Sequence, residues 1–366
     1  MNQRNSHKIA FVGCGRVAQH YLQLMTGTNQ IDGLECVGAC DLIQEKADAF
    51  TSKLGGKSFT DYEQMLSDIK PDLVFVLTPS GDHLDHAEQA LKMGIGVVSE
   101  KPIGLDPDRA RAIARFARDQ GLMYGGVFQN RWNPAVRKVK SAMEDGRFGR
   151  IVSAAIRLRW CRTQDYYEDG WHGTWAQDGG VVNQQAIHHV DALNWICGPI
   201  EAVCAAGAQR ANRLEAEDTL VAALKFANGS LGTIEVTTAA RPHDFEASLS
   251  VVGELGLAQI GGIALNKIDT WFFVNEEAAD QTVAANYSEE VPTGYGLGHI
   301  PMLRDIVGCL DEGKNEPPIS AEDAVAAVDI VHALYSSIEQ NSWVSLADKP
   351  RAQKLGRKLE EMKNGR

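Results

Sequence analysis

The sequence predicts an α/β protein of two domains: a parallel sheet covered by helices, then an α+β domain with an open, mostly antiparallel sheet. The chain has 366 residues, more than one ordinary core organises, which favours two domains. Short apolar segments alternate with helical patterns up to about residue 128. Beyond that point, longer strand patterns follow one another without helices between them, so the architecture is expected to change there.

The first 128 residues show the alternation of strands and helices that is typical of βαβ units. The expected strands are 9–13, 34–41, 72–78, 97–100 and 122–128. The expected helices are 17–25, 45–54, 61–69, 83–93 and 106–120. The last helix begins at Asp106-Pro107, where aspartate can cap the helix and proline suits the first helical position. Residues 1–128 are therefore expected to form the first domain.

Residues 129–366 are expected to form the second domain. The expected strands are 151–160, 202–210, 219–226, 230–238 and 247–252. The expected helices are 134–143, 181–193 and the amphipathic 321–340. Asn228-Gly229 lies between two of the strands, and this pair is a strong signal for a β-hairpin.

Composition narrows the class of protein. Apolar residues make up 44%, charged residues 23%, and the net charge is −12, which describes a globular protein with little affinity for nucleic acid. No apolar run reaches the roughly 18 residues of a membrane span. No apolar run follows the charges of the first eight residues, as a signal peptide would require. The seven cysteines are scattered and never arranged as C-x-x-C, so we expect reduced thiols, no metal and a cytoplasmic location.

The segment from Gly13 to Ala18 has the spacing of a dinucleotide-binding turn. It reads G-x-G-x-x-A between an apolar strand and a helix, the setting of the Rossmann fingerprint. Gly13 allows the tight turn, and Gly15 lets the backbone approach a pyrophosphate. Arg16 and Val17 open the helix, whose N–H groups and dipole favour an anion. A glycine-rich segment can also be only a turn, but this context favours the Rossmann domain.

Asp41 ends the second expected strand and bears on the choice of cofactor. A carboxylate at this place accepts hydrogen bonds from the adenosine ribose and repels a 2′-phosphate. NAD is therefore preferred over NADP. Asp41 could instead cap the next helix, and Arg16 and Lys46 could still admit NADP.

Several motifs resemble one family of enzymes. They are the G-x-G-x-x-A turn, LTPSGDH at 77–83, EKP at 100–102 and IHHVD at 187–191. Together they resemble the glucose-fructose oxidoreductase / inositol dehydrogenase / rhizopine-catabolism (Gfo/Idh/MocA) family of NAD(P)-dependent oxidoreductases, over essentially the whole chain. The phrases at 173–198 and 294–307 are most similar to members that oxidise nucleotide-linked or free pyranoses in bacterial polysaccharide pathways.

The resemblance implies hydride transfer between a sugar hydroxyl and nicotinamide. Lys101 is expected to touch cofactor and substrate hydroxyl, and His188 to act as general base, a role that suits an imidazole of ordinary pKa about 6.5. It also implies a homodimer or homotetramer formed through the open sheet. The implied cofactor-binding residues are Gly13, Gly15, Arg16, Val17, Asp41, Thr78, Pro79, His83, Glu100, Lys101 and Gln129. The expected substrate-binding residues are Lys101, Arg131, Arg162, Gln184, His188 and Asp191.

One departure from the family concerns the helix expected at 181–193. On a continuous helix Gln184, His188 and Asp191 share one narrow face. Many relatives have Asp or Asn where this chain has Gln184, and an amide cannot take up a proton. Asp191 could instead pair with Arg162 or Lys101.

Simpler readings remain for other residues near these motifs. Lys101 could be a surface residue paired with Glu100, and His189 is expected to be a packing residue. Arg157 and Arg159 share one strand face, which could be that of the pocket, a solvated face or a subunit contact. With Arg131 and Arg162 they would suit a diphosphate or a uronate carboxylate.

Three other functions stay open from the sequence. An inositol or free-sugar dehydrogenase uses the same chemistry on a plainer substrate. An NAD-dependent glycosidase oxidises the sugar transiently and returns the hydride. A non-catalytic sugar sensor keeps the fold, although the presence of both Lys101 and His188 argues against it.

Overall fold

The computed structural model describes residues 6–26 and 31–358 of the chain. These residues form two compact units, one within Met1–Val127 and His299–Val325, the other within Phe128–Gly298 and Ala326–Arg366. The segment that contains α10 (His299–Asp311) thus returns to the first unit. The boundary at 325/326 falls inside α11 (Ala321–Gln340), whose bounds are those expected from its amphipathic pattern.

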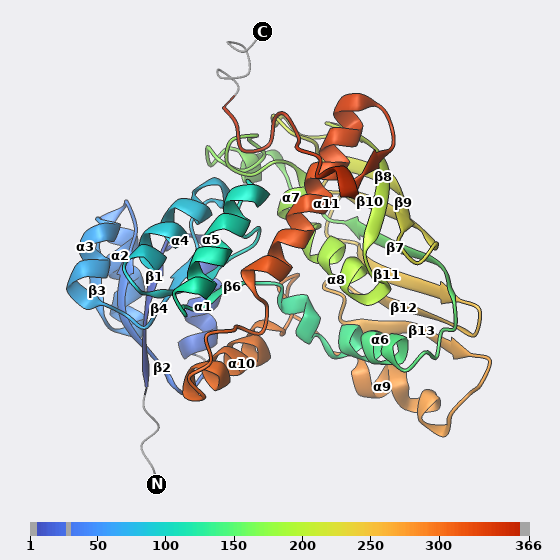
Figure 1. Cartoon of the computed structure of the whole chain (residues 1–366), viewed down its shortest axis with the longest axis horizontal. Helices are drawn as coiled ribbons and strands as arrows, with labels where there is room; N and C mark the ends of the chain where they lie inside the picture. Colours follow the sequence, from blue (N-terminus) through green and yellow to red (C-terminus); the bar gives the residue numbers. More distant parts are fainter. Residues whose placement is uncertain (1–5, 27–30, 359–366) are drawn as a thin grey trace. The chain divides into compact units, whose positions relative to one another are not determined.

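The first unit is built on a parallel sheet of order β3-β2-β1-β4-β5-β6 (Figure 1). Its strands are β1 (His7–Val12), β2 (Leu34–Cys40), β3 (Lys57–Phe59), β4 (Leu73–Val76), β5 (Gly96–Ser99) and β6 (Tyr124–Gly126). This is the Rossmann strand order, and ligands of such sheets bind at the carboxyl ends of strands beside the point where the order reverses. That point lies between β1 and β4, so the predicted class of the first domain is confirmed.

Five helices connect these strands, and their bounds agree closely with the expected ones. They are α1 (Arg16–Thr26), α2 (Gln44–Leu54), α3 (Tyr62–Ile69), α4 (His83–Lys92) and α5 (Pro107–Asp119). The Asp106 carboxylate accepts hydrogen bonds from the backbone N–H groups of Asp108 and Arg109, both at 3.0 Å, which confirms the predicted cap. Strand β3 was not anticipated, because three residues between two glycines and a threonine carry no recognisable period.

An aromatic cluster fixes the two strands at the reversal point. Phe11 of β1 stacks on Phe75 of β4 with ring centroids 5.2 Å apart, and Phe50 and Tyr21 close around Phe11. All four side chains are buried. Such rings each remove a large apolar area from water and prefer offset or edge-on contacts, so the strand ends that carry the cofactor residues rest on a rigid base.

The second unit is built on an eight-stranded sheet of order β13-β12-β11-β7-β10-β9-β8-β14. Its strands are β7 (Ile151–Arg159), β8 (Ile200–Ala208), β9 (Thr219–Phe226), β10 (Leu231–Thr237), β11 (Glu246–Gly253), β12 (Gly256–Gly261), β13 (Lys267–Phe273) and β14 (Val344–Ser345). Only the β7–β10 pair is parallel among these described pairs. The expected open, mostly antiparallel sheet is confirmed, as is the hairpin at Asn228-Gly229, where Gly229 has a φ of +83°.

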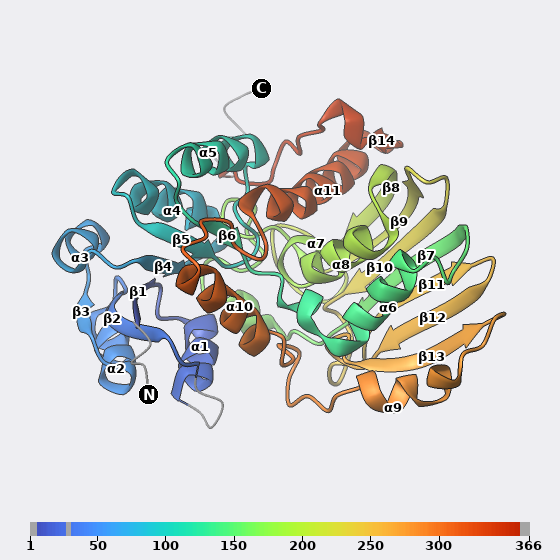
Figure 2. The ribbon, with the colours of Figure 1, turned by 60° about the horizontal axis from the view of Figure 1, so that its bottom comes forward.

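Helices cover one face of this sheet, and the other face is open (Figure 2). The covering helices include α6 (Pro134–Glu144) and α8 (Ile187–Cys197), which contact β12 and β7. In β7 the side chains of Ala154, Ile156 and Leu158 are buried on the helix side, whereas Arg157 points to the open face. No helix in the described part of the chain is long and apolar enough to cross a membrane.

Candidate active site

The turn between β1 and α1 has the form that a pyrophosphate requires. Gly13 has a φ of +89°, and a Cβ at this position would lie 2.7 Å from the carbonyl carbon of Leu77. A Cβ on Gly15 would meet nothing within 4 Å, so the backbone there is open to a ligand. Helix α1 starts at Arg16 and has no acidic residue in its first turn, which leaves its positive dipole end available for an anion. The residues present fit a bound dinucleotide.

Asp41 stands at the carboxyl end of β2 and is held by this turn. Its carboxylate accepts hydrogen bonds from the backbone N–H of Cys14 at 2.8 Å and of Ile43 at 2.9 Å. Helix α2 begins at Gln44 after Ile43, which provides no side-chain cap. Asp41 is therefore anchored to the glycine-rich turn, as the ribose-binding interpretation requires.

Sequence reasoning missed the two residues after Asp41. Leu42 is 92% exposed and Ile43 46% exposed, an unusual position for two apolar side chains next to a polar turn. Their only signal in the sequence is an apolar pair where the first turn of a surface helix should be polar. They offer an apolar surface beside Asp41.

Thr78 and Pro79 follow β4 and are tied to the segment after β5 by His83. The His83 ring is buried, with Nε2 2.8 Å from the Thr78 carbonyl oxygen and Nδ1 2.7 Å from that of Pro102. Burial is the main cause that lowers the pKa of His83. Both ring nitrogens lie against backbone carbonyl oxygens, so His83 positions its neighbours. Its expected place beside the cofactor stays a prediction.

Lys101 follows β5 at the same carboxyl edge of the sheet, and Glu100 supports it. Glu100 is buried; its Oε1 accepts from the Tyr21 hydroxyl at 3.0 Å and its Oε2 from the Lys101 backbone N–H at 3.2 Å. His299 of α10 lies 3.8 Å from Glu100 Oε1. The Glu100 carboxylate is buried and holds the Lys101 segment in place. Its expected contact with the cofactor stays a prediction.

The helix expected at 181–193 is interrupted. The structure has α7 (Val181–Gln184) and α8 (Ile187–Cys197), separated by Gln185 and Ala186, so the expectation of one continuous helix was wrong. The side-chain amide of Gln184 donates to Asp178 Oδ1 at 2.6 Å, and both residues are buried. This bond anchors α7, and the break at Gln185 and Ala186 interrupts the single helical face expected for Gln184 and His188. The contact of Gln184 with substrate stays a prediction.

His188 lies in the first turn of α8 and is partly exposed, unlike its neighbour. Its ring meets Phe128 edge-on, with centroids 5.7 Å apart. His189 is buried, neither ring nitrogen has a hydrogen-bond partner among the described residues, and burial lowers its pKa to about 4. His189 is therefore the neutral packing residue that the sequence predicted, whereas the His188 side chain is only partly buried.

Arg131 and Asp191, both expected to bind substrate, bind each other, and their contact with substrate stays a prediction. Arg131 Nε and Nη2 donate to the two carboxylate oxygens of Asp191 at 2.8 and 2.6 Å. Asp191 is only 4% exposed, and the guanidinium lies 5.4 Å from the Trp195 ring centroid. The pair fastens α8 to the short helix Gln129–Trp132, so Arg131 is a partner of Asp191 that the sequence did not suggest.

Gln129, expected to line the cofactor, precedes this pair in the chain. Its side chain is buried, and its Oε1 has no hydrogen-bond partner among the residues that the structure describes. A buried acceptor without a partner is costly. Gln129 Oε1 is thus an atom that a bound donor would stabilise.

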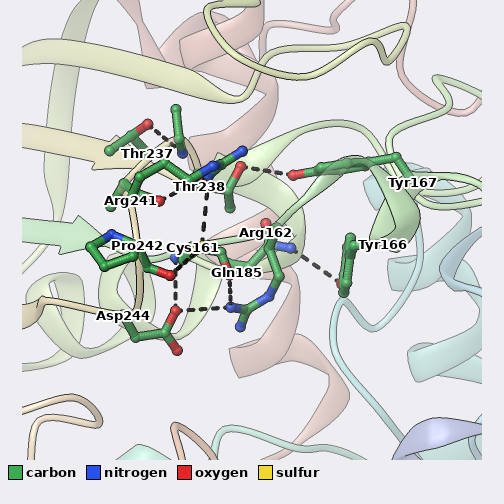
Figure 3. Close-up of polar contacts among 12 residues, drawn as sticks. Cys161, Arg162, Tyr166, Tyr167, Gln185, Thr237, Thr238, Arg241, Pro242 and Asp244 are labelled. Atoms are coloured by element: carbon green, nitrogen blue, oxygen red, sulfur yellow. Dashed lines mark hydrogen bonds and ion pairs between the residues drawn. The ribbon is translucent and has the colours of Figure 1, made fainter.

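The four arginines considered for substrate charge separate into different environments. Arg157 and Arg159 lie on the open face of the sheet, where they pair with Glu235, and Arg159 also with Glu246. Of the three placements left open for these two side chains, the structure favours a solvated face or a subunit contact, because the helix-covered side of β7 carries the residues of opposite parity. Arg162 lies beyond the end of β7 and bonds to Asp244 (Figure 3).

A buried carboxyl group beneath α7 had no signal in the sequence. Glu217 Oε1 accepts from the Val182 backbone N–H at 3.1 Å and from the Tyr335 hydroxyl at 3.2 Å. Burial is the main cause that raises the pKa of Glu217 to about 7, from 4.5. The folded protein therefore binds this proton more tightly than the unfolded chain does.

A stability prediction follows from Glu217. The contribution of Glu217 to the free energy of unfolding is present below pH 4.5 and is lost as pH rises through about 7. Across that window, the free energy of unfolding of the wild type should fall by about 3 kcal/mol relative to that of Glu217→Gln. Urea unfolding of both proteins from pH 4.5 to 8 measures this difference. If the free energies of unfolding of the two proteins changed in parallel with pH, the pKa of Glu217 would not be raised.

The glycine-rich turn, Asp41 at the end of β2 and the N-terminus of α1 together define the first unit as a dinucleotide-binding domain of the kind found in oxidoreductases. Models of known protein families support this assignment. Residues 7–127 match the oxidoreductase family with an NAD-binding Rossmann fold, and residues 136–259 match the GFO/IDH/MocA C-terminal domain. The chain belongs to the GFO/IDH/MocA family of NAD-binding oxidoreductases. The family and the NAD-binding class expected from the sequence are confirmed.

Individual relatives cover most of the chain. The WlbA dehydrogenase from Bordetella pertussis, solved in complex with NADH and UDP-GlcNAcA, is 33% identical with a TM-score of 0.87, over 93% of this chain and 98% of that one. The D-glucoside 3-dehydrogenase of Escherichia coli (strain K12) is 29% identical over 63% of this chain and 70% of its own length. An inositol 2-dehydrogenase of Rubrobacter xylanophilus is 24% identical over 86% of both chains.

Proposed function

We propose that this protein is an NAD-dependent sugar dehydrogenase that oxidises a secondary hydroxyl of a pyranose, free or nucleotide-linked, to a ketone. The observation that carries the proposal is the position of Lys101, which follows β5 at the same strand edge as the dinucleotide turn and is held there by Glu100. Similar proteins named as glucoside, inositol and WlbA dehydrogenases support the substrate class.

Two side chains handle the hydroxyl proton in this proposal. The Lys101 ammonium stabilises negative charge as it develops on the sugar oxygen. The His188 imidazole accepts the proton from that oxygen while the hydride leaves the same carbon, so that the C–O bond becomes C=O. Bound NAD supplies the hydride acceptor. Gln129 Oε1, a buried acceptor, is suited to orient a bound group that carries an N–H.

A substrate screen tests this function. Purified protein with NAD is mixed with myo-inositol, free hexoses, aryl glucosides, and UDP-linked N-acetylhexosamines and their uronates, and NADH is followed by its absorbance. We expect NADH to accumulate with at least one pyranose, and the Lys101→Ala variant to lose this activity. Release of free sugar from an aryl glucoside without NADH would favour the glycosidase, and NAD binding with no reaction would favour the sensor.

We also propose a preference for NAD over NADP, which depends on Asp41. Replacing Asp41 with Ser removes the carboxylate that is held by the Cys14 and Ile43 N–H groups. Because hydrogen bonds to a charged group contribute about 1.5–3 kcal/mol, the KM for NAD should rise about 10- to 100-fold. The KM for NADP should fall, since the repulsion of its 2′-phosphate is relieved. Unchanged KM values for both cofactors would exclude this role for Asp41.

The open face of the second sheet is proposed as the contact between copies of the chain. Val221 is 48% exposed and Leu231 58% exposed, and both lie on neighbouring strands of this face. Exposed apolar residues on an extended surface are typical of subunit interfaces. Light scattering of Leu231→Glu should give a smaller mass than wild type. A monomeric wild-type protein would contradict the proposed contact.

A further inference from the structure

Arg162 is the one arginine of the β7 segment that lies on the helix side of the sheet. The side chain of Trp160, two residues earlier, is buried and meets the His189 ring of α8 edge-on, with centroids 6.2 Å apart. The Arg162 guanidinium lies over this same Trp160 ring, 5.0 Å from its centroid. Arg162 is therefore near the helix that carries His188, whereas Arg157 and Arg159 point to the opposite face.

The structure holds the Arg162 side chain in one orientation. Nη1 donates to Asp244 Oδ1 at 3.0 Å and to the Cys161 carbonyl oxygen at 2.7 Å. Tyr166 lies 5.6 Å from the guanidinium, and its hydroxyl accepts from the side-chain amide of Gln185, three residues before His188 (Figure 3). A guanidinium fixed in this way loses little conformational entropy when it binds a ligand.

The edge of this guanidinium formed by Nε and Nη2 takes no part in these bonds. Both bonds just described use Nη1, so Nε and Nη2 have no hydrogen-bond partner among the described residues. These two N–H groups form the fork that binds a carboxylate through two parallel bonds. The same chain shows that use of the fork, since Arg131 binds Asp191 through Nε and Nη2.

We propose that Arg162 is the specificity-determining residue of the proposed dehydrogenase and binds a carboxylate of the sugar, so that the substrate is a sugar acid. This inference rests on the proposed function. A carboxylate is favoured over a phosphate because Asp244 already places one negative charge on the guanidinium. A planar monoanion matches the open fork, whereas a more highly charged group is repelled more strongly by Asp244.

Four substrates distinguish carboxylate binding by Arg162 from phosphate binding. They are a neutral hexose and its uronate, and a UDP-linked N-acetylhexosamine and its uronate. Each is assayed with wild type, Arg162→Gln and Arg162→Lys, with Arg157→Gln as the control from the open face of the same strand. For the uronates, we expect Arg162→Gln to raise KM about 10- to 100-fold, the loss typical of a charge-assisted pair. The KM of Arg162→Lys for the uronates should lie between those of wild type and Arg162→Gln, because lysine keeps the charge but lacks the fork. The KM of Arg157→Gln should match that of wild type.

Other results would overturn the inference. Equal KM changes for neutral and acidic sugars would show that Arg162 only shapes the site. Changes confined to the UDP-linked pair would assign Arg162 to a phosphate. Calorimetric titration of the NADH-loaded protein with the uronate reads binding without turnover. If wild type oxidises no sugar yet binds the uronate through Arg162, the proposed function fails while the carboxylate site stands; no binding and no oxidation would reject both.

Discussion

Replacing His188 with Gln should lower kcat about 10²- to 10⁴-fold, because a positioned general base contributes about that factor. Glutamine keeps the approximate size and polarity of the side chain but cannot take up the hydroxyl proton. Steady-state NADH formation with the best sugar of the screen measures the effect. The KM for NAD should change little, since His188 is proposed to act on the substrate hydroxyl.

The adjacent histidine provides the matched control. His189 is buried and neutral in the same helix turn, so His189→Gln should reduce the free energy of unfolding but retain most of kcat. A loss of kcat in His189→Gln with full activity in His188→Gln would reverse the two assignments. Full activity in both variants would leave Lys101 as the only proposed proton-handling group.

Replacing Arg131 with Ala should destabilise the protein by about 3–5 kcal/mol, because it removes the bidentate cation partner of the buried Asp191 carboxylate. Asp191 is 4% exposed and receives two hydrogen bonds from Arg131. Urea unfolding monitored by circular dichroism gives the change in the free energy of unfolding. Much of the loss should be recovered in Arg131→Met/Asp191→Leu, where no buried charge remains.

The double variant separates structure from substrate binding. If Arg131 and Asp191 act only by fastening α8, the double variant should regain activity together with stability. Recovery of stability without activity would return both residues to the substrate site, as the sequence first suggested. A single Arg131→Ala variant as stable as wild type would mean that the Asp191 charge is not buried in solution.

Local sequence patterns were sufficient for most of the fold. The glycine turn, the Asp106 cap and the Asn228-Gly229 hairpin depend on a few neighbouring residues, and each forms as expected. Strands β12 and β13 were missed because β12 is a short segment bounded by glycines and β13 follows a segment without a clear period. The break after α7 was missed because the apolar pattern of 181–193 continues through it.

The places of the candidate site residues in the fold were predicted more readily than their contacts. The motifs placed Asp41 and Lys101 at strand ends, and the sheet order brings those ends to one edge. Pairs such as Arg131–Asp191 and Gln184–Asp178 depend on tertiary packing, which no spacing in the sequence encodes. Glu217 lies 118 residues from Tyr335, so its buried position could only be learned from the structure.

The most direct test of the proposed dehydrogenase is the fate of the hydrogen on the oxidised carbon. The best sugar of the screen is supplied in fully deuterated form with NAD, and the cofactor and sugar products are analysed by mass spectrometry. We predict one deuterium in the NADH and an equal amount of keto sugar. Unlabelled NADH would contradict the account. Deuterium retained in a released free sugar, with no net NADH, would also contradict it and would identify a cofactor-recycling reaction.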